Sequence, residues 1–458
     1  MAKALKKSVN DPLYDDTYPL LHKIEEGKTK QPEKPKGFGA RHTLTLWAFL
    51  GFVNLYAMRV NLSVAMVAMV NSNSTSESNA SVGLQKNDED EGEFNWNEET
   101  QGKVLGAFFY GYLVSQVPGG WLATRFGGKR VFGLGMLLTS ILTLLTPVAA
   151  RSSVYLLMAV RVVEGLGEGV VFPAMHSLLG VWAPLYERSM LAVITYSGTD
   201  LGTVITMPIS GLLCDSDILG GWPSVFYIMG AVSLLWSICW LAFVYDSPAQ
   251  HPSISKEERA YIEASIGKSV SPGRPPWGKI FASSAMWAIV VAQTANNWGL
   301  YVFLTCLPTY MKQILKFNMK GSRFCVYLVC PLALDSDAVQ FFTVCRIHNT
   351  CCATSVLCET TTCILLGISN TFAAIPGFVS PLLVGALTNN NQTRGQWQIV
   401  FYITSVIYVL GAVVYIFLAQ GEALPWGQLS SATTDAPGST AINETDTEEE
   451  PEKKTSKA

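Results

Sequence analysis

The feature that most constrains the fold is a series of apolar runs, each long enough to cross a lipid bilayer. A helix needs about 20 predominantly apolar residues to span the hydrocarbon core. The 458-residue chain is 49% hydrophobic and only 15% charged, so we predict an all-α polytopic membrane protein. Six runs lie in the first half and three in the second: 44–69, 102–123, 131–150, 154–182, 189–213, 223–245, 284–307, 364–388 and 398–419.

The charges between these runs predict the orientation of the chain. Residues 1–42 hold nine Lys or Arg and no long apolar run, so we expect a cytosolic tail without a cleaved signal peptide. Loop 71–99 carries one Lys against eight acids and is predicted to be luminal. The glycosylation sequons at Asn73, Asn79 and Asn391 are usable only on that side.

The same pattern predicts the domain organisation. Residues 43–245 form an N-terminal six-helix bundle, and a hydrophilic cytosolic connector follows at 246–282. An incomplete C-terminal bundle occupies 283–420. The tail at 421–458 is rich in Ser, Thr, Glu, Pro and Lys, and we expect it to be disordered in the cytosol.

Segment 324–363 does not fit the pattern. It holds seven of the ten cysteines and has room for at most one weakly apolar span, which gives about ten spans in the whole chain. The number of crossings before residue 364 must be odd to keep Asn391 luminal. The cysteines lack zinc-like spacing, so we expect no metal site, whereas luminal disulfides stay open.

The stretch "RVVEGLGEGVVFPAMH" places charges inside an apolar run, where they are costly and tend to mark function. On one continuous helix, Arg161, Glu164, Glu168 and His176 fall within an arc of about 120° and face one interior. Arg161 and Glu164 at i,i+3 also fit a structural ion pair. Three glycines between these residues allow close approach of another helix or a substrate: Gly165, Gly167 and Gly169.

A buried carboxylate and an imidazole are the groups that a proton-coupled carrier requires. Glu168 and His176 therefore become candidates for proton coupling, and Pro173 is expected to loosen the backbone near His176. Arg59, in the first span, is a candidate anion clamp because its guanidinium fork matches a carboxylate. The alternative is that Arg59 pairs with Glu164 or Glu168. Arg41 is expected to be an interfacial anchor at the cytosolic mouth.

The stretch "GGWLATRFGGKR" at 119–130 resembles the loop signature of the major facilitator superfamily, with Thr124 in place of the usual acid. The stretches "YAMRVNLSVAMV", "FFYGYLVSQVPGGWLA" and "GISNTFAAIPGFVSPLLVGALT" resemble the organic-anion branch of that superfamily. The resemblance covers 1–323 and 364–426. It implies two helix bundles, twelve spans in the family, with the substrate between the bundles and alternating access by rocking.

The resemblance also implies a function, which is proton-coupled symport of sialic acid and related acidic sugars from lysosome lumen to cytosol. Acidic amino acids in vesicles, phosphate and other organic anions are alternative cargoes, and a truncated isoform acting as a membrane scaffold is an alternative of another class. No motif suggests an enzyme, a cofactor or a nucleic-acid partner. The residues implied are Arg59, Tyr110, His176 and Asn297 for the substrate, Glu164, Glu168 and His176 for the proton, and Lys129 and Arg130 in the gating loop.

Two further expectations concern the sorting signal of the chain and the origin of segment 324–363. "DDTYPLL", with Asp16, Leu20 and Leu21, fits an acidic-dileucine signal read by clathrin adaptors, although so short a pattern also arises by chance. It predicts the lysosomal membrane, with synaptic vesicles or the plasma membrane as alternatives. Segment 324–363 stands where the family has three spans, so we expect an altered splice form, a deletion or a mistaken gene structure.

Overall fold

The structure is a computed structural model that describes residues 35, 37–70, 92–216, 218–266, 277–306, 309–310, 362–388 and 393–418. Several sequence predictions lie outside these residues. They are the dileucine residues Asp16, Leu20 and Leu21, the sequons at Asn73, Asn79 and Asn391, and nearly all of segment 324–363.

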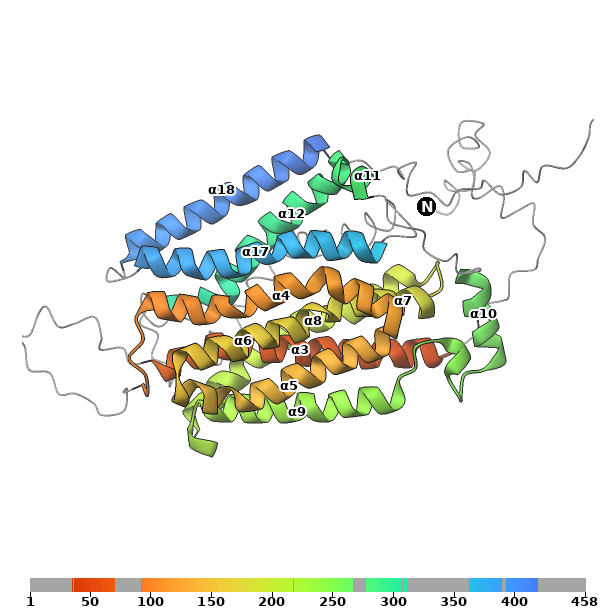
Figure 1. The fold of residues 1–458 in the computed structure, drawn as a ribbon, viewed down its shortest axis with the longest axis horizontal. Coiled ribbons are helices and arrows are strands. Elements are labelled where there is room, and N and C mark those ends of the chain that lie inside the picture. Colours follow the sequence, from red (N-terminus) through yellow and green to blue (C-terminus); the bar gives the residue numbers. More distant parts are fainter. Residues whose placement is uncertain are drawn as a thin grey trace, which may run out of the picture.

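The described chain is helical, and its long helices run side by side (Figure 1). Within the described residues, the only β-type pairing is an isolated bridge between Val70 and Phe94. The long helices are α3 Ala40–Met69, α4 Glu98–Phe126, α5 Gly128–Ser152, α6 Val154–Gly169, α7 Val171–Trp182, α8 Arg188–Asp215, α9 Pro223–Phe243, α12 Ser284–Tyr301, α17 Thr362–Thr388 and α18 Arg394–Leu418. The shorter elements are η3 Ile218–Gly220, η4 Pro248–Gln250, α10 Lys256–Ile266, α11 Trp277–Phe281 and the π-helix η5 Val302–Cys306.

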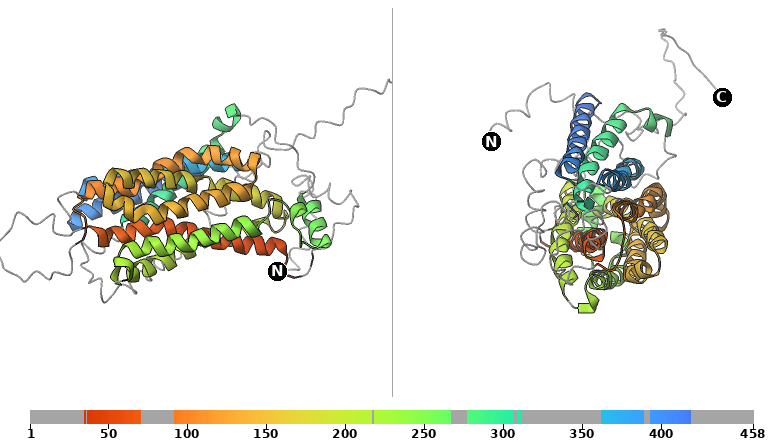
Figure 2. Two further views of the ribbon diagram at one scale, coloured as in Figure 1. Left: turned by 60° about the horizontal axis from the view of Figure 1, so that its bottom comes forward. Right: turned by 90° about the vertical axis from the view of Figure 1, so that its left-hand side faces the viewer.

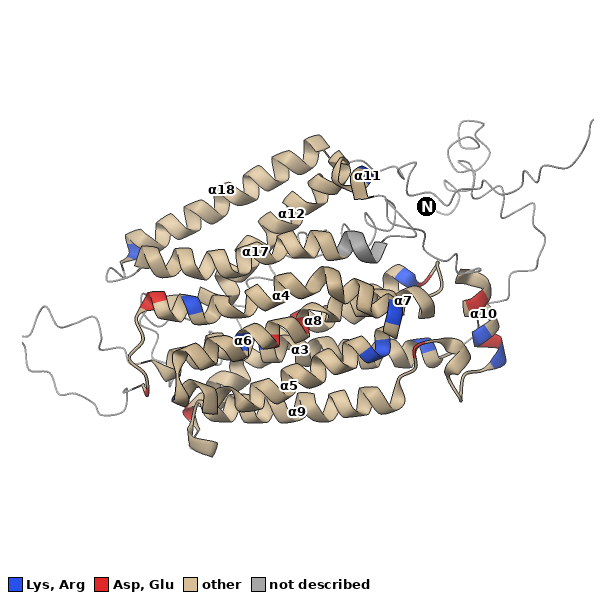
Figure 3. Cartoon of the chain, in the orientation of Figure 1, with Lys and Arg blue, Asp and Glu red and all other residues tan. Residues whose placement is uncertain are grey.

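Length and composition alone mark five of the described helices as able to cross a membrane: α3, α5, α9, residues Gly367–Thr388 of α17, and α18. Lysines, arginines and acids gather near the helix ends, and few lie at mid-length (Figure 3). Because the hydrocarbon core disfavours charge, the rare charges at mid-length are the ones that need a local explanation.

The helices form two groups, seen end-on in Figure 2. In the first group α3 lies inside, with most of its side chains buried, and the pairs α3–α8, α4–α6 and α5–α9 pack closely. In the second group α12 packs against α17 and α18. The groups meet where α4 lies along α17. There, a Cβ on Gly102 would stand 2.8 Å from the Pro381 carbonyl oxygen, so the two backbones touch.

The predicted span 154–182 is two helices, so a single continuous helix was wrong. α6 ends at Gly169 and α7 begins at Val171. Pro173 explains the break, because its nitrogen carries no hydrogen to donate to the carbonyl oxygen of Gly169 one turn back. The break therefore lies before Pro173, at Val170, whose side chain packs against Gly119 of α4 and Gly135 of α5.

The three glycines of this segment make helix contacts. A Cβ on Gly165 would collide with the carbonyl oxygen of Phe108, and one on Gly169 with Ser115, both on α4. A Cβ on Gly167 would stand 2.8 Å from the Thr139 hydroxyl oxygen on α5. Of the two uses open from the sequence, close approach of a neighbouring helix is the one present at these positions.

Candidate functional site

Two buried ion pairs lie in the middle of the first helix group. Arg59 of α3 donates from Nε and Nη2 to the same oxygen, Oε2 of Glu168 on α6, at 2.9 and 2.7 Å. One turn earlier on α6, Arg161 Nη1 donates to Glu164 Oε2 at 2.6 Å. Neither carboxylate is more than 1% exposed. Charges so deeply buried persist only when paired, and each acid here has an arginine.

Aromatic rings surround the guanidinium of Arg59. Its Cζ lies 4.9 Å from the ring centre of Tyr56, 5.1 Å from that of Phe108 and 4.7 Å from that of Tyr112. The electron-rich faces of such rings attract a cation. Arg59 therefore has an environment in which its charge is tolerated while its polar edge stays committed to Glu168.

Glu164 has a second set of partners on α5. Its Oε1 lies 3.3 Å from the hydroxyl oxygens of both Thr143 and Thr146. The sequence patterns did not predict a role for these two threonines. The stretch "TSILTLLT" does hold a signal for them, since Thr139, Thr143 and Thr146 recur at helical spacing on one face of an apolar run.

His176 lies away from these pairs. It is half-buried on α7, and its Nδ1 is 3.3 Å from the hydroxyl of Tyr196 on α8. His176 lies eight positions after Glu168 and beyond the break at Val170, and eight residues of helix rise about 12 Å. The four polar residues therefore do not meet in one cluster. Arg161, Glu164 and Glu168 lie together on α6, and His176 belongs to a second location.

Of the remaining substrate candidates, Tyr110 lies where the two helix groups meet, and Asn297 lies between two helices of the second group. Tyr110 of α4 is 47% exposed, and its ring centre is 4.9 Å from that of Phe378 on α17. Asn297 of α12 is buried and donates from Nδ2 to the carbonyl oxygen of Ala373 at 2.9 Å, whereas its Oδ1 has no hydrogen-bond partner among the described residues. Among the described residues, neither Tyr110 nor Asn297 forms a hydrogen bond with Arg59.

The predicted gating loop is held by an acid that the sequence reading missed. Asp246 Oδ1 accepts from the backbone N–H of Lys129 at 2.9 Å, at the start of α5. Gly127 immediately precedes α5 and has φ +92°, a backbone conformation that favours glycine. A Cβ at Gly127 would also stand 2.5 Å from Asp246 Oδ1, so there is no space for a side chain. Lys129 Nζ lies over the Tyr245 ring at 5.2 Å, and Arg130 is exposed.

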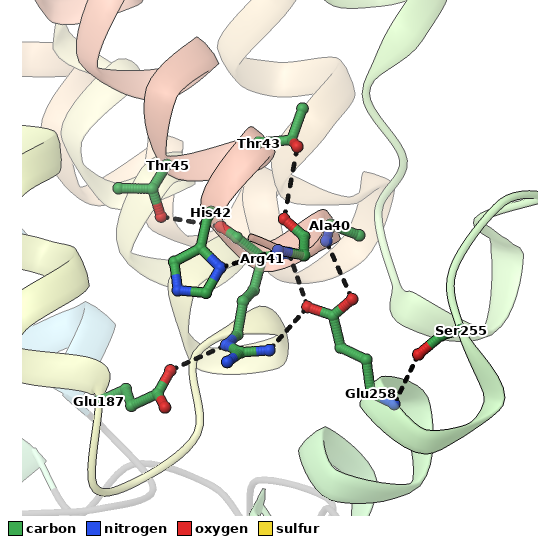
Figure 4. Close-up of polar contacts among 9 residues, drawn as sticks. Ala40, Arg41, His42, Thr43, Thr45, Glu187, Ser255 and Glu258 are labelled. Carbon is green, nitrogen blue, oxygen red and sulfur yellow. Dashed lines mark hydrogen bonds and ion pairs between the residues drawn. The ribbon is translucent and has the colours of Figure 1, made fainter. Parts of the chain in front are cut away.

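Arg41 is not an interfacial anchor, and that expectation was wrong. It is 1% exposed, and its Nε and Nη1 each lie 2.8 Å from a carboxylate oxygen, of Glu187 and Glu258 respectively (Figure 4). Glu258 also accepts from the backbone N–H groups of Ala40 and Arg41 at 2.9 and 3.2 Å. We refer to Arg41, Glu187 and Glu258 as the Arg41 cluster. It binds the connector helix α10 to the start of α3.

A counterpart at the opposite end of the helices joins the segment before α4 to α5 and α9. Glu93 receives Arg151 Nε at 2.9 Å and Trp222 Nε1 at 3.0 Å. The hydrogen bond from Arg151 holds the pKa of Glu93 below its ordinary value, and the bond from Trp222 acts in the same direction. Phe94 stacks on Trp96, with ring centres 4.6 Å apart, so the segment is fixed by apolar contact as well.

Comparison with known proteins identifies the family. Residues 47–334 match the Major Facilitator Superfamily. The chain belongs to this superfamily. It is therefore a multi-pass membrane transporter protein and not an enzyme.

The chain is 39% identical to sialin of Homo sapiens, over 90% of this chain and 94% of that protein. It is 33% identical to vesicular glutamate transporter 2 of Homo sapiens, over 95% of this chain and 84% of that one. A crystal structure of a bacterial homologue of the human lysosomal transporter Spinster aligns with a TM-score of 0.58 at 14% identity, covering 83% of this chain and 98% of that one, and it supports the fold alone.

The sialin alignment runs over 476 positions, more than the 458 residues of this chain. The relative therefore has positions that this chain lacks.

Proposed function

We propose that the chain is a proton-coupled symporter that carries sialic acid and related acidic sugars from an acidic lumen to the cytosol. The observation that supports this proposal best is the buried pair of Arg59 and Glu168 in a chain of this family. The likeness to sialin and to a vesicular glutamate transporter favours a small organic anion as cargo. The lysosomal membrane is the compartment that we propose on the same grounds.

The pair gives a physical route to coupling. Both described N–H groups of Arg59 go to one oxygen of Glu168, the same bidentate edge that a substrate carboxylate would use. When a proton neutralises Glu168, the buried guanidinium loses its counter-charge, which costs about 3–5 kcal/mol. An incoming anion restores that counter-charge. Proton and anion therefore favour each other's binding, and by linkage the effect is reciprocal.

The test is uptake into proteoliposomes that contain the full chain. We expect labelled sialic acid to accumulate when the pH gradient is imposed and to stop when a protonophore dissipates it. Glucuronate, glutamate and phosphate serve as competing anions that rank the cargo. Absence of any gradient-driven flux with all four anions would refute the proposal and leave the scaffold alternative.

Variants of the pair test the coupling itself. Arg59→Lys keeps the charge but loses the fork, and we expect at least about a tenfold loss of anion affinity. Glu168→Gln imitates the protonated acid, so anion binding should persist and lose the pH dependence that Glu168 contributes. Lys103→Gln is the matched control, because the pair of Lys103 with Glu99 is half exposed at the start of α4. Unchanged affinity in Arg59→Lys would contradict the clamp.

A further inference from the structure

The two threonine hydroxyls beside Glu164 cannot each serve two acceptors at once. Thr143 Oγ lies 2.9 Å from the carbonyl oxygen of Thr139, and Thr146 Oγ lies 3.0 Å from that of Leu142. The same two hydroxyl oxygens lie 3.3 Å from Glu164 Oε1. A hydroxyl carries a single hydrogen, so each threonine donates either to its own helix or to the carboxylate.

The distances favour donation to the helix. Bonds from a hydroxyl to a carboxylate are charge-assisted and typically measure about 2.5–2.7 Å, well short of the 3.3 Å here. The backbone distances are those of ordinary bonds from threonine to the carbonyl one turn back. With their hydrogens directed to α5, both hydroxyls turn oxygen lone pairs toward Glu164, and they can accept a hydrogen bond from it.

The two oxygens of Glu164 are therefore unlike. Oε2 is held by Arg161 at 2.6 Å, and it is the oxygen on which negative charge is compensated. Oε1 faces two hydroxyl oxygens whose hydrogens are committed elsewhere. Glu164 and Thr143 are each 1% exposed and Thr146 is fully buried, so water does not compete at this location.

The other groups around Glu164 do not change the difference between its two oxygens. On its own helix, α6, the charged neighbours are Arg161 and, one turn on, Glu168, which is paired with Arg59 of α3. From α4 the ring of Phe108 lies 5.3 Å from the guanidinium carbon of Arg161, and α5 supplies the threonines.

We propose that Glu164 takes up a proton on Oε1 and that either Thr143 or Thr146 stabilises the neutral acid by accepting its single O–H hydrogen bond. This inference rests on the proposed function and adds to it, since it names a second acid beside Glu168, the oxygen of that acid that receives a proton, and two positioning residues for it. The proton enters and leaves as H⁺, and no other bond changes.

The test is infrared difference spectroscopy of the full chain in lipid, titrated between neutral and acidic pH. The carbonyl band of the protonated acid is assigned to Glu164 by its disappearance in Glu164→Gln. Thr143→Val combined with Thr146→Val removes both acceptors, so we expect the titration midpoint of this double variant to fall by about one pH unit, the equivalent of one ordinary hydrogen bond. Each single valine variant should lower the midpoint by less. Thr143→Ser keeps the hydroxyl and should restore the midpoint.

Thr139→Val is the matched control. Thr139 is buried on the same face of α5 and donates to the carbonyl oxygen of Gly135 at 3.0 Å, but it makes no bond to Glu164 among the described contacts. We expect its midpoint to match the parent. A rise of the midpoint in the valine variants would overturn the proposal, because it would mean that the hydroxyls donate to the carboxylate. An unchanged midpoint, or no Glu164 band at any pH, would overturn it too.

The infrared experiment separates a failure of this inference from misfolding of the variants and from a failure of the proposed function. If the valine variants do not fold, the frequency of the Glu164 band in the parent still reports whether its O–H donates a hydrogen bond, and a free O–H refutes the proposal. The spectra require no transport. A titrating Glu164 in a chain without flux refutes the proposed function alone, and flux with a silent Glu164 refutes this inference alone.

Discussion

Glu258→Gln is the substitution whose effect can be worked out most fully from the contacts. The carboxylate accepts three hydrogen bonds, from the backbone N–H groups of Ala40 and Arg41 and from Arg41 Nη1. Gln keeps the volume and one acceptor oxygen, but it removes the charge and turns an NH₂ group toward donors. Breaking a buried ion pair from one side costs about 3–5 kcal/mol. Since Glu187 still holds Arg41 Nε, we expect about 3 kcal/mol, the lower end of that range.

The loss of stability in Glu258→Gln should appear first where α10 packs against the start of α3. We expect the amides of Lys256–Ile266 to exchange with deuterium faster, and the midpoint of thermal unfolding in lipid nanodiscs to fall. Arg41→Met should cost a similar amount, and the double variant should cost less than the sum of the two, because the residues share one interaction.

A neighbour on the same helix provides the control. Arg259 pairs with Glu263 at 2.7 Å, but the two side chains are 46% and 53% exposed. Solvent weakens such a pair, so Arg259→Ala should change stability by no more than about 0.5 kcal/mol. Equal effects of Glu258→Gln and Arg259→Ala would refute the reasoning, since they would show that burial of the Arg41 cluster adds nothing.

Further outcomes concern the Glu93 contacts and the helix contacts. Glu93→Gln should lower stability by about 0.5 kcal/mol, because the pair with Arg151 is partly exposed. Since the pKa of Glu93 lies below its ordinary 4.5, this difference should persist in unfolding experiments at pH 5 and vanish only in stronger acid, as pH falls through the lowered value. Gly165→Ala should destabilise by about 1–3 kcal/mol in thermal unfolding, since its methyl group meets the α4 backbone. Gly180→Ala, on α7 with nothing within 4 Å, should be neutral or stabilising; equal losses at both glycines would contradict this.

Apolar length predicted most of the helices, because a bilayer sets one scale for every span. The predicted run 131–150 corresponds to α5 at Gly128–Ser152, and the run 223–245 to α9 at Pro223–Phe243. Local chemistry also predicted the i,i+3 pair of Arg161 with Glu164, which is present. These features depend on residues within a few turns of one another.

Features that depend on distant residues escaped the sequence reading. Arg41 reads as an interfacial anchor until Glu258, 217 residues later, is placed beside it. The choice of Arg59 between two acids depends on how α3 packs against α6, and that packing is tertiary. Asp246 was missed for the same reason, because it acts at the start of a helix more than a hundred residues before it.

The hydrogen bonds at the start of α3 can be completed only late in synthesis. Gly39 offers no side chain to the start of α3, and the N–H of Ala40 instead donates to a residue 218 positions later. At ribosomal speeds of about 5–20 residues per second, that partner emerges roughly 10–40 seconds after the helix it completes. During that interval the first helix must wait in the membrane with its N-terminal end unfinished. The start of the first helix is completed only after every helix from α3 to α9 has been made.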